Sequence, residues 1–358
     1  MRRIGVEEEL LLVRPATPRA TPSGEEVVQR AAEHGRPVEQ EFKQEQIEIA
    51  SEPQSDASTL LADLVAKRAA AIASAAAEGV QVAAIATSPG RVLPRGTEDE
   101  RYQRMVAEFG LLAAEQLTCG QHIHVDVADP AEGVRALDRI RGWLPVLVAL
   151  SGNSPFWSDR DTGYASFRSV LWGRWPSAGP APLFGDEDGY RAAIQQQLDT
   201  GSALDDGMIY FDARLSARYP TVEIRVADVC TDVRDAVLLA VLARGLVDTA
   251  VERAAEAPLP LTLPVLRAAS WRAARWGMEG TLINPLTGLQ EPADQVRDSL
   301  LDWITPALHA SGDLAHVQQN LRRIERDGTG AQRQRAVFAR TGELAEVVAD
   351  AVRRTAAG

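Results

Sequence analysis

The length, composition and charge of this chain limit the classes of protein to which it can belong. Its 358 residues, 45% of them hydrophobic, suffice for one large domain or two ordinary ones with a substantial core. The formal net charge of −12 argues against a nucleic-acid-binding protein. Two cysteines are too few for a disulfide framework, and no apolar run approaches the roughly 20 residues of a membrane span. The chain starts directly with a predicted strand rather than a signal peptide, so we expect a cytoplasmic protein.

Strands and helices alternate along the first part of the chain, and helices dominate the rest. Residues 4–13, 41–51, 80–87, 118–127, 208–215 and 221–229 are predicted strands. Helical spacing predicts helices over 57–78, 99–116, 131–152 and 233–256. After Pro258, helices are predicted over 263–277, 292–310, 312–326 and 330–356. We therefore expect an α+β protein with a sheet-containing core, residues 1–257, and a helical part, residues 258–358, packed on it as one unit.

A long segment between these elements, residues 151–186, is rich in Gly, Pro and Ser and contains Trp157, Trp172 and Trp175. Loops of this length are usually lids or binding loops, or else disordered. The three tryptophans argue against disorder. We expect this segment, which includes Arg168, to close over a site.

A second segment, residues 327–335, combines a glycine-containing turn with Arg333 and Arg335. Backbone N–H groups in such a turn can bind a phosphate group. The same pattern is also common as a simple turn before a helix, so both interpretations stay open.

Glutamates recur at alternating positions of the predicted strands. Glu7 and Glu9 point to the same face of the first strand, because strand side chains alternate. Three other strands contribute Glu48, Glu223 and the pair His122 and His124. Either each glutamate is an outward polar residue of a half-exposed sheet, or the strands share one acidic face.

An acidic face of this kind would need cations. Two carboxylates ~4 Å apart repel by ~1 kcal/mol in water and by ~4 kcal/mol at an effective dielectric constant near 20. Burying a carboxylate without a partner adds a further cost. Carboxylate oxygens together with one imidazole suit a hard divalent cation such as Mg²⁺ or Mn²⁺.

Six short motifs, in this order along the chain, resemble those of the glutamate–cysteine ligase type 2 family, the bacterial carboxylate–amine ligases. The motifs are GVEEEL at 5–10, QIE at 46–48, ERYQR at 100–104, GQHIHV at 120–125, WGRWP at 172–176 and TVEIR at 221–225. Each motif alone is weak, whereas their order and spacing are specific. The resemblance extends from residue 4 to about residue 340.

This resemblance implies a catalytic core like that of glutamine synthetase and the guanidino kinases. A curved, mainly antiparallel sheet with helices on one side would carry metal ligands on its concave face. ATP would transfer its γ-phosphoryl group to a substrate carboxylate. An amine would then attack the acyl phosphate and give an amide, ADP and phosphate, with glutamate and cysteine as the leading substrate pair.

The resemblance also implies two metal sites. One Mg²⁺ or Mn²⁺ would be held by Glu7, Glu41 and Glu48, and a second by Glu9, His122 and Glu223. Glu41 and Glu48 differ by an odd number of positions, which on a flat strand places them on opposite faces. A bulge, a bend, or a Glu41 that precedes the strand would reconcile them, with Gln44 and Glu45 as alternative ligands.

Arg104 and Arg168 are assigned to the substrate carboxylate or the transferring phosphoryl group, and Arg225 is assigned to the phosphates. Arginine binds both groups through paired hydrogen bonds. The alternative for each is an ordinary surface residue or, for Arg225, a structural ion pair with Asp228. Substrate or nucleotide binding is assigned to His124, Trp172, Arg333 and Arg335.

Two other functions compete with the ligase: a guanidino-kinase-like phosphotransferase, and a hydrolase whose His and Glu ligands bind Zn²⁺. The expected partners are a small-molecule carboxylate and amine, without nucleic acid or membrane. A homo-oligomer is an alternative to a monomer.

Overall fold

Seven strands form one antiparallel sheet in the computed structural model, which describes residues 1–357. In spatial order the strands are β2 (Glu39–Gln40), β3 (Gln46–Ala50), β1 (Ile4–Val13), β5 (Gly120–Asp126), β9 (Thr221–Asp228) and β8 (Ala213–Leu215). The remaining strand, β4 (Gln81–Ala83), pairs with the end of β1. The long strand β1 thus lies between β3 and β5 at the centre of the sheet.

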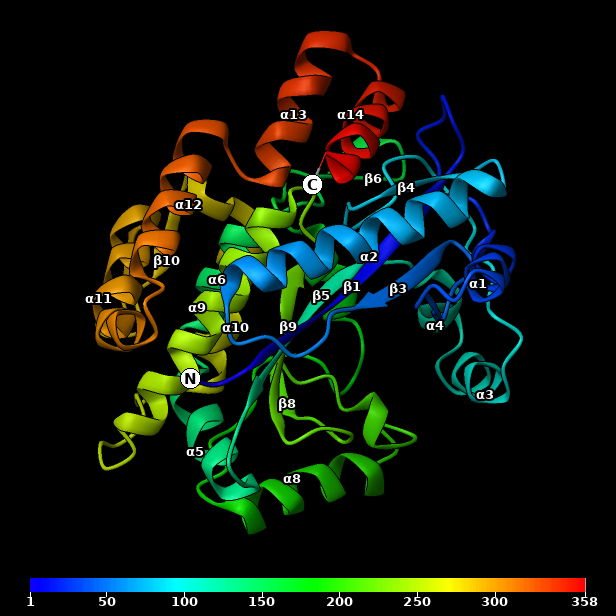
Figure 1. Cartoon of the computed structure of the whole chain (residues 1–358). Helices are drawn as coiled ribbons and strands as arrows, with labels where there is room; N and C mark the ends of the chain where they lie inside the picture. Colours follow the sequence, from blue (N-terminus) through cyan, green and yellow to red (C-terminus); the bar gives the residue numbers. More distant parts are fainter. Residues whose placement is uncertain (358) are drawn as a thin grey trace.

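Two long helices, α2 (Ala57–Ala77) and α9 (Val233–Glu252), pack against one face of this sheet and against each other. Figure 1 shows α2 crossing in front of β1 and β3. Helix α9 is apolar nearly all round, as expected of a helix buried between a sheet and other helices. The strand residues on this face are also apolar and buried: Val6, Leu10, Ile47, Ile49, Ile123 and Ile224. The sheet therefore has a dry, helix-covered side.

One charged pair interrupts this apolar layer. Glu8, between the two other glutamates of β1, points to the helix side and is fully buried. The Arg68 guanidinium on α2 donates two hydrogen bonds to it, at 2.8 and 2.6 Å. The same guanidinium donates to the carbonyls of Cys230 and Thr231. This pair fixes α2 to the sheet and to the start of α9.

Replacing Arg68 with Ala should destabilise the protein strongly. The substitution leaves the Glu8 carboxylate buried without a counter-charge, which typically costs about 3–5 kcal/mol. Denaturant unfolding of Arg68→Ala, Glu8→Gln and the double variant should show that the double variant loses less than the sum of the two single losses. Additive losses would mean that the two side chains contribute independently.

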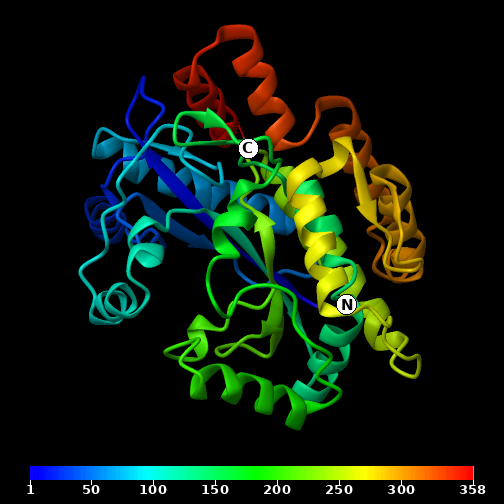
Figure 2. The same ribbon diagram turned by 180° about the vertical axis from the view of Figure 1, so that it is seen from behind.

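The other helices surround the sheet, and Figure 2 shows α10 in front when the molecule is seen from behind. Before α9 come α1 (Gly24–Glu33), α3 (Glu100–Phe109), α4 (Leu111–Glu115), α5 (Pro130–Ile140), α6 (Leu144–Ser151), α7 (Phe167–Trp172) and α8 (Glu187–Asp199). After it come α10 (Leu263–Trp276), α11 (Ala293–Ser311), α12 (Leu314–Asp327), α13 (Gly330–Thr341) and α14 (Leu344–Ala356). Helices α10, α11 and α12 share one hydrophobic core with the sheet, to which both Ile4 and Leu300 belong, whereas α13 and α14 pack in separate clusters.

The structure confirms the predicted fold class: helices with an open antiparallel sheet, and a helical C-terminal part. Several boundaries differ for local reasons. The helices predicted over 99–116 and 330–356 each break at a glycine with positive φ, Gly110 (55°) and Gly342 (72°). The prediction missed α1 and α8, and a hairpin of β10 (Thr281–Ile283) and β11 (Gln290–Pro292) interrupts the C-terminal helices. Within residues 1–357, none of the helices combines the length and hydrophobicity that crossing a bilayer requires.

Candidate active site

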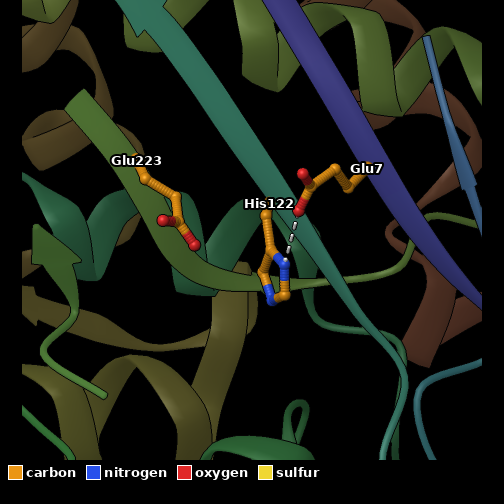
Figure 3. Close-up of side chains that lie close together, drawn as sticks. All are labelled: Glu7, His122 and Glu223. Carbon is orange, nitrogen blue, oxygen red and sulfur yellow. Dashed lines mark hydrogen bonds and ion pairs between the residues drawn. The ribbon is translucent and has the colours of Figure 1, made fainter. Parts of the chain in front are cut away.

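The sheet face opposite α2 and α9 carries a cluster of carboxylates and imidazoles. The strand register brings them together: Glu7 lies opposite His122, Glu9 opposite Glu48, and His124 opposite Glu223. Figure 3 shows Glu7, His122 and Glu223 extending from three neighbouring strands toward a common space. His122 Nδ1 lies 3.2 Å from a Glu7 carboxylate oxygen, and His124 Nε2 lies 3.3 Å from the other. The alternation seen in the sequence thus places these groups on one face.

Two groups of side chains in this cluster have the spacing of metal ligands. Glu7, His122 and Glu223 form one, and Glu9, Glu48 and His122 form the other, with ligand atoms within 4.8 Å of one another in each. This grouping differs from the predicted division, which set Glu7 with Glu48 and Glu9 with Glu223. Glu7 and Glu9 change places between the two groups because the strand register pairs Glu7 with His122 and Glu9 with Glu48.

The donor set of this cluster fits hard divalent cations. It consists mainly of carboxylate oxygens, with imidazole nitrogen as the other donor. In addition, His122 Nε2 is buried and has no hydrogen-bond partner among the described residues. A buried nitrogen of this kind needs a partner, and a cation held by the neighbouring carboxylates would supply one.

Electrostatics divide the cluster into two halves. Burial would raise the pKa of Glu7, but hydrogen bonds from His122 and His124 outweigh it and hold the pKa low. Burial also acts on Glu223, where the charges of Arg225 and Arg214 prevail and lower the pKa to about 2. These two carboxylates are therefore balanced by positive groups of the protein itself.

The other half of the cluster lacks such balance. Burial, together with the charge of Glu9, raises the pKa of Glu41 to about 7. Burial and the nearby charges of Glu41, Glu7 and Glu9 raise the pKa of Glu48 well above its usual range. This half is therefore where a divalent cation would relieve the most repulsion.

Glu41 lies outside any strand, in the turn between β2 and β3. The predicted strand over 41–51 in fact begins at Gln46, so the parity difficulty between Glu41 and Glu48 disappears. Both residues line the same cavity. The alternative ligands point elsewhere: Gln44 accepts a hydrogen bond from the Glu25 N–H, and Glu45 accepts one from the Arg95 N–H.

A cavity of about 260 Å³, which we call the acidic cavity, opens over the cluster. Opposite the sheet it is lined by Arg101 and Tyr102 of α3. Arg101 is held in place by two hydrogen bonds to Asp205, at 2.8 and 3.0 Å. Arg104, the arginine of α3 assigned to the site from the sequence, lies on the exposed side of the helix and does not line this cavity, so that assignment stays a prediction.

A second cavity of about 520 Å³, which we call the aromatic cavity, adjoins the first. The two cavities share four lining residues: Trp172, Trp175, Tyr210 and Arg225. The Arg225 guanidinium pairs with Glu223 and lies 5.9 Å from the ring centroids of both Trp172 and Tyr210. Of the predicted arginines, Arg225 therefore lies at the junction of the two cavities.

Arg168, on α7, lines the aromatic cavity but is almost entirely buried, at 2% exposure. Its guanidinium donates to the backbone carbonyls of Arg225 and Val226, at 3.1 and 3.3 Å. These two residues form a bulge in β9, because both lie opposite His122 of β5. We infer that Arg168 positions Arg225 by holding this bulge.

Gly120, at the start of β5, is where the Arg168 guanidinium rests against the sheet. A Cβ atom at this position would overlap the guanidinium. Replacing Gly120 with Ala should therefore displace Arg168, destabilise the protein by about 1–3 kcal/mol and lower turnover. Thermal unfolding and steady-state rates would measure both effects, with Gly96→Ala as a control because no atom lies within 4 Å of a Cβ there. Equal behaviour of the two variants would contradict this role of Arg168.

The glycine-containing turn before α13 is occupied by the protein itself. The Thr329 N–H donates to Gln332 Oε1 (2.7 Å), and the Ala331 N–H donates to the Gly152 carbonyl (2.8 Å). Arg333 pairs with the buried Asp235 and Arg335 with Asp161, and neither arginine lines the acidic or the aromatic cavity. The structure thus gives these two arginines structural ion pairs, and their assignment to nucleotide binding stays a prediction. The turn itself packs α13 against the rest of the protein.

Sequence reasoning missed a row of cavity residues beside β9. Tyr210, Asp212 and Arg214 alternate along the chain, and all three line one or both cavities. Arg214 donates to Glu223 at 2.9 Å from the neighbouring strand. The signal was present in the sequence, because polar residues at every second position of a predicted strand mark one face. In the structure only Ala213–Leu215 of the strand predicted over 208–215 is regular.

Known proteins resemble this chain over nearly its whole length. The sequence pattern of glutamate-cysteine ligase family 2 matches residues 3–350. This chain belongs to that family. A Streptomyces coelicolor protein provisionally named glutamate–cysteine ligase 2 is 49% identical over 364 residues, covering all of both chains. A Paenarthrobacter aurescens protein with a similarly provisional name is 46% identical, over 99% of this chain and 95% of its own.

Solved structures share the fold at low sequence identity. The bifunctional glutathione synthetase of Pasteurella multocida matches with a TM-score of 0.68 and 15% identity, over 99% of this chain and 52% of its own. This chain thus spans about half of that protein. The glutamate–cysteine ligase of Francisella tularensis, solved in complex with AMP, matches with a TM-score of 0.66 and 12% identity, over 100% of this chain and 89% of its own. At these identities the likeness establishes the fold.

Proposed function

We propose that this protein joins a small-molecule carboxylate to an amine in an ATP-dependent reaction, with glutamate and cysteine as the leading pair. One observation carries the proposal: a cavity lined by a carboxylate and imidazole cluster adjoins a second, aromatic cavity through Arg225. A ligase of this kind needs one place for the phosphate groups and another for the incoming amine. Membership of the glutamate–cysteine ligase family supports this choice.

Two Mg²⁺ or Mn²⁺ ions would fit the cluster, with Glu7, His122 and Glu223 around one and Glu9, Glu48 and Glu41 around the other. Bound there, they would neutralise the charge of the phosphate oxygens. The protein's own arginines complete the charge balance. Arg225, fixed by Glu223 and by the bulge that Arg168 holds, is placed to bind the transferring phosphoryl group at the junction of the cavities.

The chemistry assigned to the protein groups is therefore positioning and charge stabilisation rather than covalent catalysis. Both cysteines are fully or almost fully buried, and burial raises the pKa of each thiol well above its usual value. Neither is therefore suited to act as a nucleophile. We infer direct phosphoryl transfer from ATP to the substrate carboxylate, followed by attack of the amine on the acyl phosphate.

The adjoining aromatic cavity also bears on the two competing functions. A guanidino-kinase-like enzyme phosphorylates one substrate and has no second acceptor to accommodate. A Zn²⁺ hydrolase generally has more nitrogen or sulfur ligands than this carboxylate-rich cluster offers. The ligase thus explains both the donor set and the second cavity.

The test is whether ¹⁸O from the substrate carboxylate appears in the released phosphate. Wild-type protein is incubated with ATP, Mg²⁺, ¹⁸O-labelled glutamate and a panel of amines that includes cysteine, and released phosphate and product are analysed by mass spectrometry. We expect ADP, an amide, and phosphate that contains one ¹⁸O atom from the carboxylate. Release of AMP and pyrophosphate would contradict this route and indicate an adenylate. Unlabelled phosphate would mean that the carboxylate is not the acceptor.

A further inference from the structure

The aromatic cavity contains two opposite charges that have no partner in the protein. Among residues 1–357, its only carboxylate is that of Asp212, which directly precedes β8 and is half-buried, and one of its arginines is Arg267, on the exposed side of α10. Within residues 1–357, neither side chain makes a hydrogen bond or an ion pair to another side chain or to the backbone. Of the other three arginines, Arg225 and Arg174 are paired with Glu223 and Glu115, and Arg168 with backbone carbonyls. A ligand with both an anionic and a cationic group would satisfy both of the remaining charges.

Asp212 is held firmly although its carboxylate is unpaired. Its N–H donates to the Gly179 carbonyl and its own carbonyl accepts from the Arg225 N–H, both at 2.9 Å. Asp212 and Arg225 are therefore cross-strand neighbours, yet the Arg225 guanidinium turns to Glu223 instead. Burial without a paired cation raises the pKa of Asp212 to about 7, although the charge of Arg168 opposes this rise. An ammonium group would supply the missing counter-charge.

The walls of the cavity suit the same kind of ligand. Trp172, Trp175 and Trp271 line it together with Tyr210 and Phe211. Aromatic faces attract a cation as well as apolar groups, so an ammonium group near Asp212 would gain from them. A cavity of about 520 Å³ lies within the usual range of sites for small molecules.

We propose that the aromatic cavity binds the amine substrate as a zwitterionic amino acid, with its ammonium group on Asp212 and its carboxylate on Arg267. This inference rests on the proposed ligase function. The carboxylate that receives the phosphoryl group lies beside the acidic cluster in this proposal, and the adjoining cavity is assigned to the amine because its two charges match those of an amino acid. Asp212 is the cross-strand neighbour of the shared residue Arg225, so the amine nitrogen lies on the side of the acyl phosphate. The ammonium group first gives one proton to the Asp212 carboxylate, and the neutral amine then attacks the acyl carbon, from which phosphate leaves. Asp212 and Arg267 are thus specificity-determining residues.

The experiment compares three acceptors with ATP, Mg²⁺ and glutamate. Cysteine carries both charges, cysteamine lacks the carboxylate, and hydroxylamine is small and uncharged near neutral pH. Asp212→Asn should raise the KM for cysteine and for cysteamine by about 10- to 100-fold, as expected when a charge-assisted hydrogen bond is lost. Arg267→Ala should raise the KM for cysteine by a similar factor but leave cysteamine unchanged. In both variants, hydroxamate formation and the KM for glutamate should change far less than these KM values, because neither hydroxylamine nor glutamate needs the two charges.

Asp302→Asn, which removes an exposed carboxylate of α11 outside both cavities, is the matched control for charge. Unchanged KM values for both thiol amines in Asp212→Asn would overturn the inference. So would a raised KM for glutamate, or a wild-type preference for cysteamine over cysteine. If Asp212→Asn does not fold, the ratio of cysteine to cysteamine turnover in Arg267→Ala still decides the orientation. A wild-type protein that forms no hydroxamate refutes the ligase function itself, which distinguishes that failure from this one.

Discussion

Replacing Glu48 with Gln should lower ATP turnover at least about 100-fold and leave the metal-free protein as stable as the wild type or more stable. Turnover falls because the variant loses a charged ligand from the more repulsive half of the cluster, and charge stabilisation of this kind is typically worth several kcal/mol in phosphoryl transfer. Stability rises because burial and the charges of Glu41, Glu7 and Glu9 make the ionised Glu48 carboxylate unfavourable in the folded protein, as its raised pKa shows. Removing its charge relieves that repulsion, by about 1 kcal/mol or more.

The contrasting variant is Glu223→Gln, which should lose turnover to a similar extent but also lose stability. Glu223 is the counter-charge of both Arg225 and Arg214. Because these arginines are nearly buried, removing their partner should cost about 3 kcal/mol. Urea unfolding in excess EDTA, together with steady-state turnover in Mg²⁺, measures both properties for each variant.

Asp302→Asn serves again as a control for the loss of one carboxylate outside the site. The division of the cluster into a repulsive and a balanced half would be refuted if Glu48→Gln and Glu223→Gln changed stability in the same direction. Near wild-type turnover in both variants would remove the acidic face from the chemistry.

Removing divalent cations should abolish ATP turnover, and restoring Mg²⁺ or Mn²⁺ should recover it. The cluster contains five carboxylates. Burial and neighbouring carboxylates outweigh the charge of Arg225 at Glu41 and raise the pKa of both Glu41 and Glu48. A triphosphate would add further negative charge to this cavity, so its binding should need cations. In the absence of nucleotide, Mg²⁺ should also raise the melting temperature of the wild-type protein, because only the folded state holds the cluster together.

The same titration of melting temperature against Mg²⁺ should give a smaller rise in Glu48→Gln, while Asp302→Asn should follow the wild type. Full ATP-dependent turnover in excess EDTA would contradict a metal-dependent mechanism. A melting temperature that responds equally to Mg²⁺ in all three proteins would place the cation elsewhere on the molecule.

Local patterns in the sequence determined much of this protein. Alternation along β1 put Glu7 and Glu9 on one face and Glu8 on the other, because strand side chains alternate whatever the rest of the fold does. Apolar spacing located the long helices α2 and α9, whose burial follows from their composition. The ordered motifs indicated the family that the comparisons confirm.

Only the tertiary structure decided which of these groups meet. The register of β1 with β3 and β5 places Glu7 opposite His122 and Glu9 opposite Glu48. The pattern within a single strand does not reveal how far neighbouring strands are shifted relative to each other. The orientation of α3 places Arg101 rather than Arg104 in the acidic cavity. Arg333 and Arg335 form ion pairs with Asp235 and Asp161, which are far from them in the sequence. The pairing of β8 with β9 placed Asp212 beside Arg225, whose guanidinium pairs with Glu223. Contacts between segments far apart in the chain depend on how whole helices and strands pack, whereas the local sequence determines only which side chains lie on each face of an element.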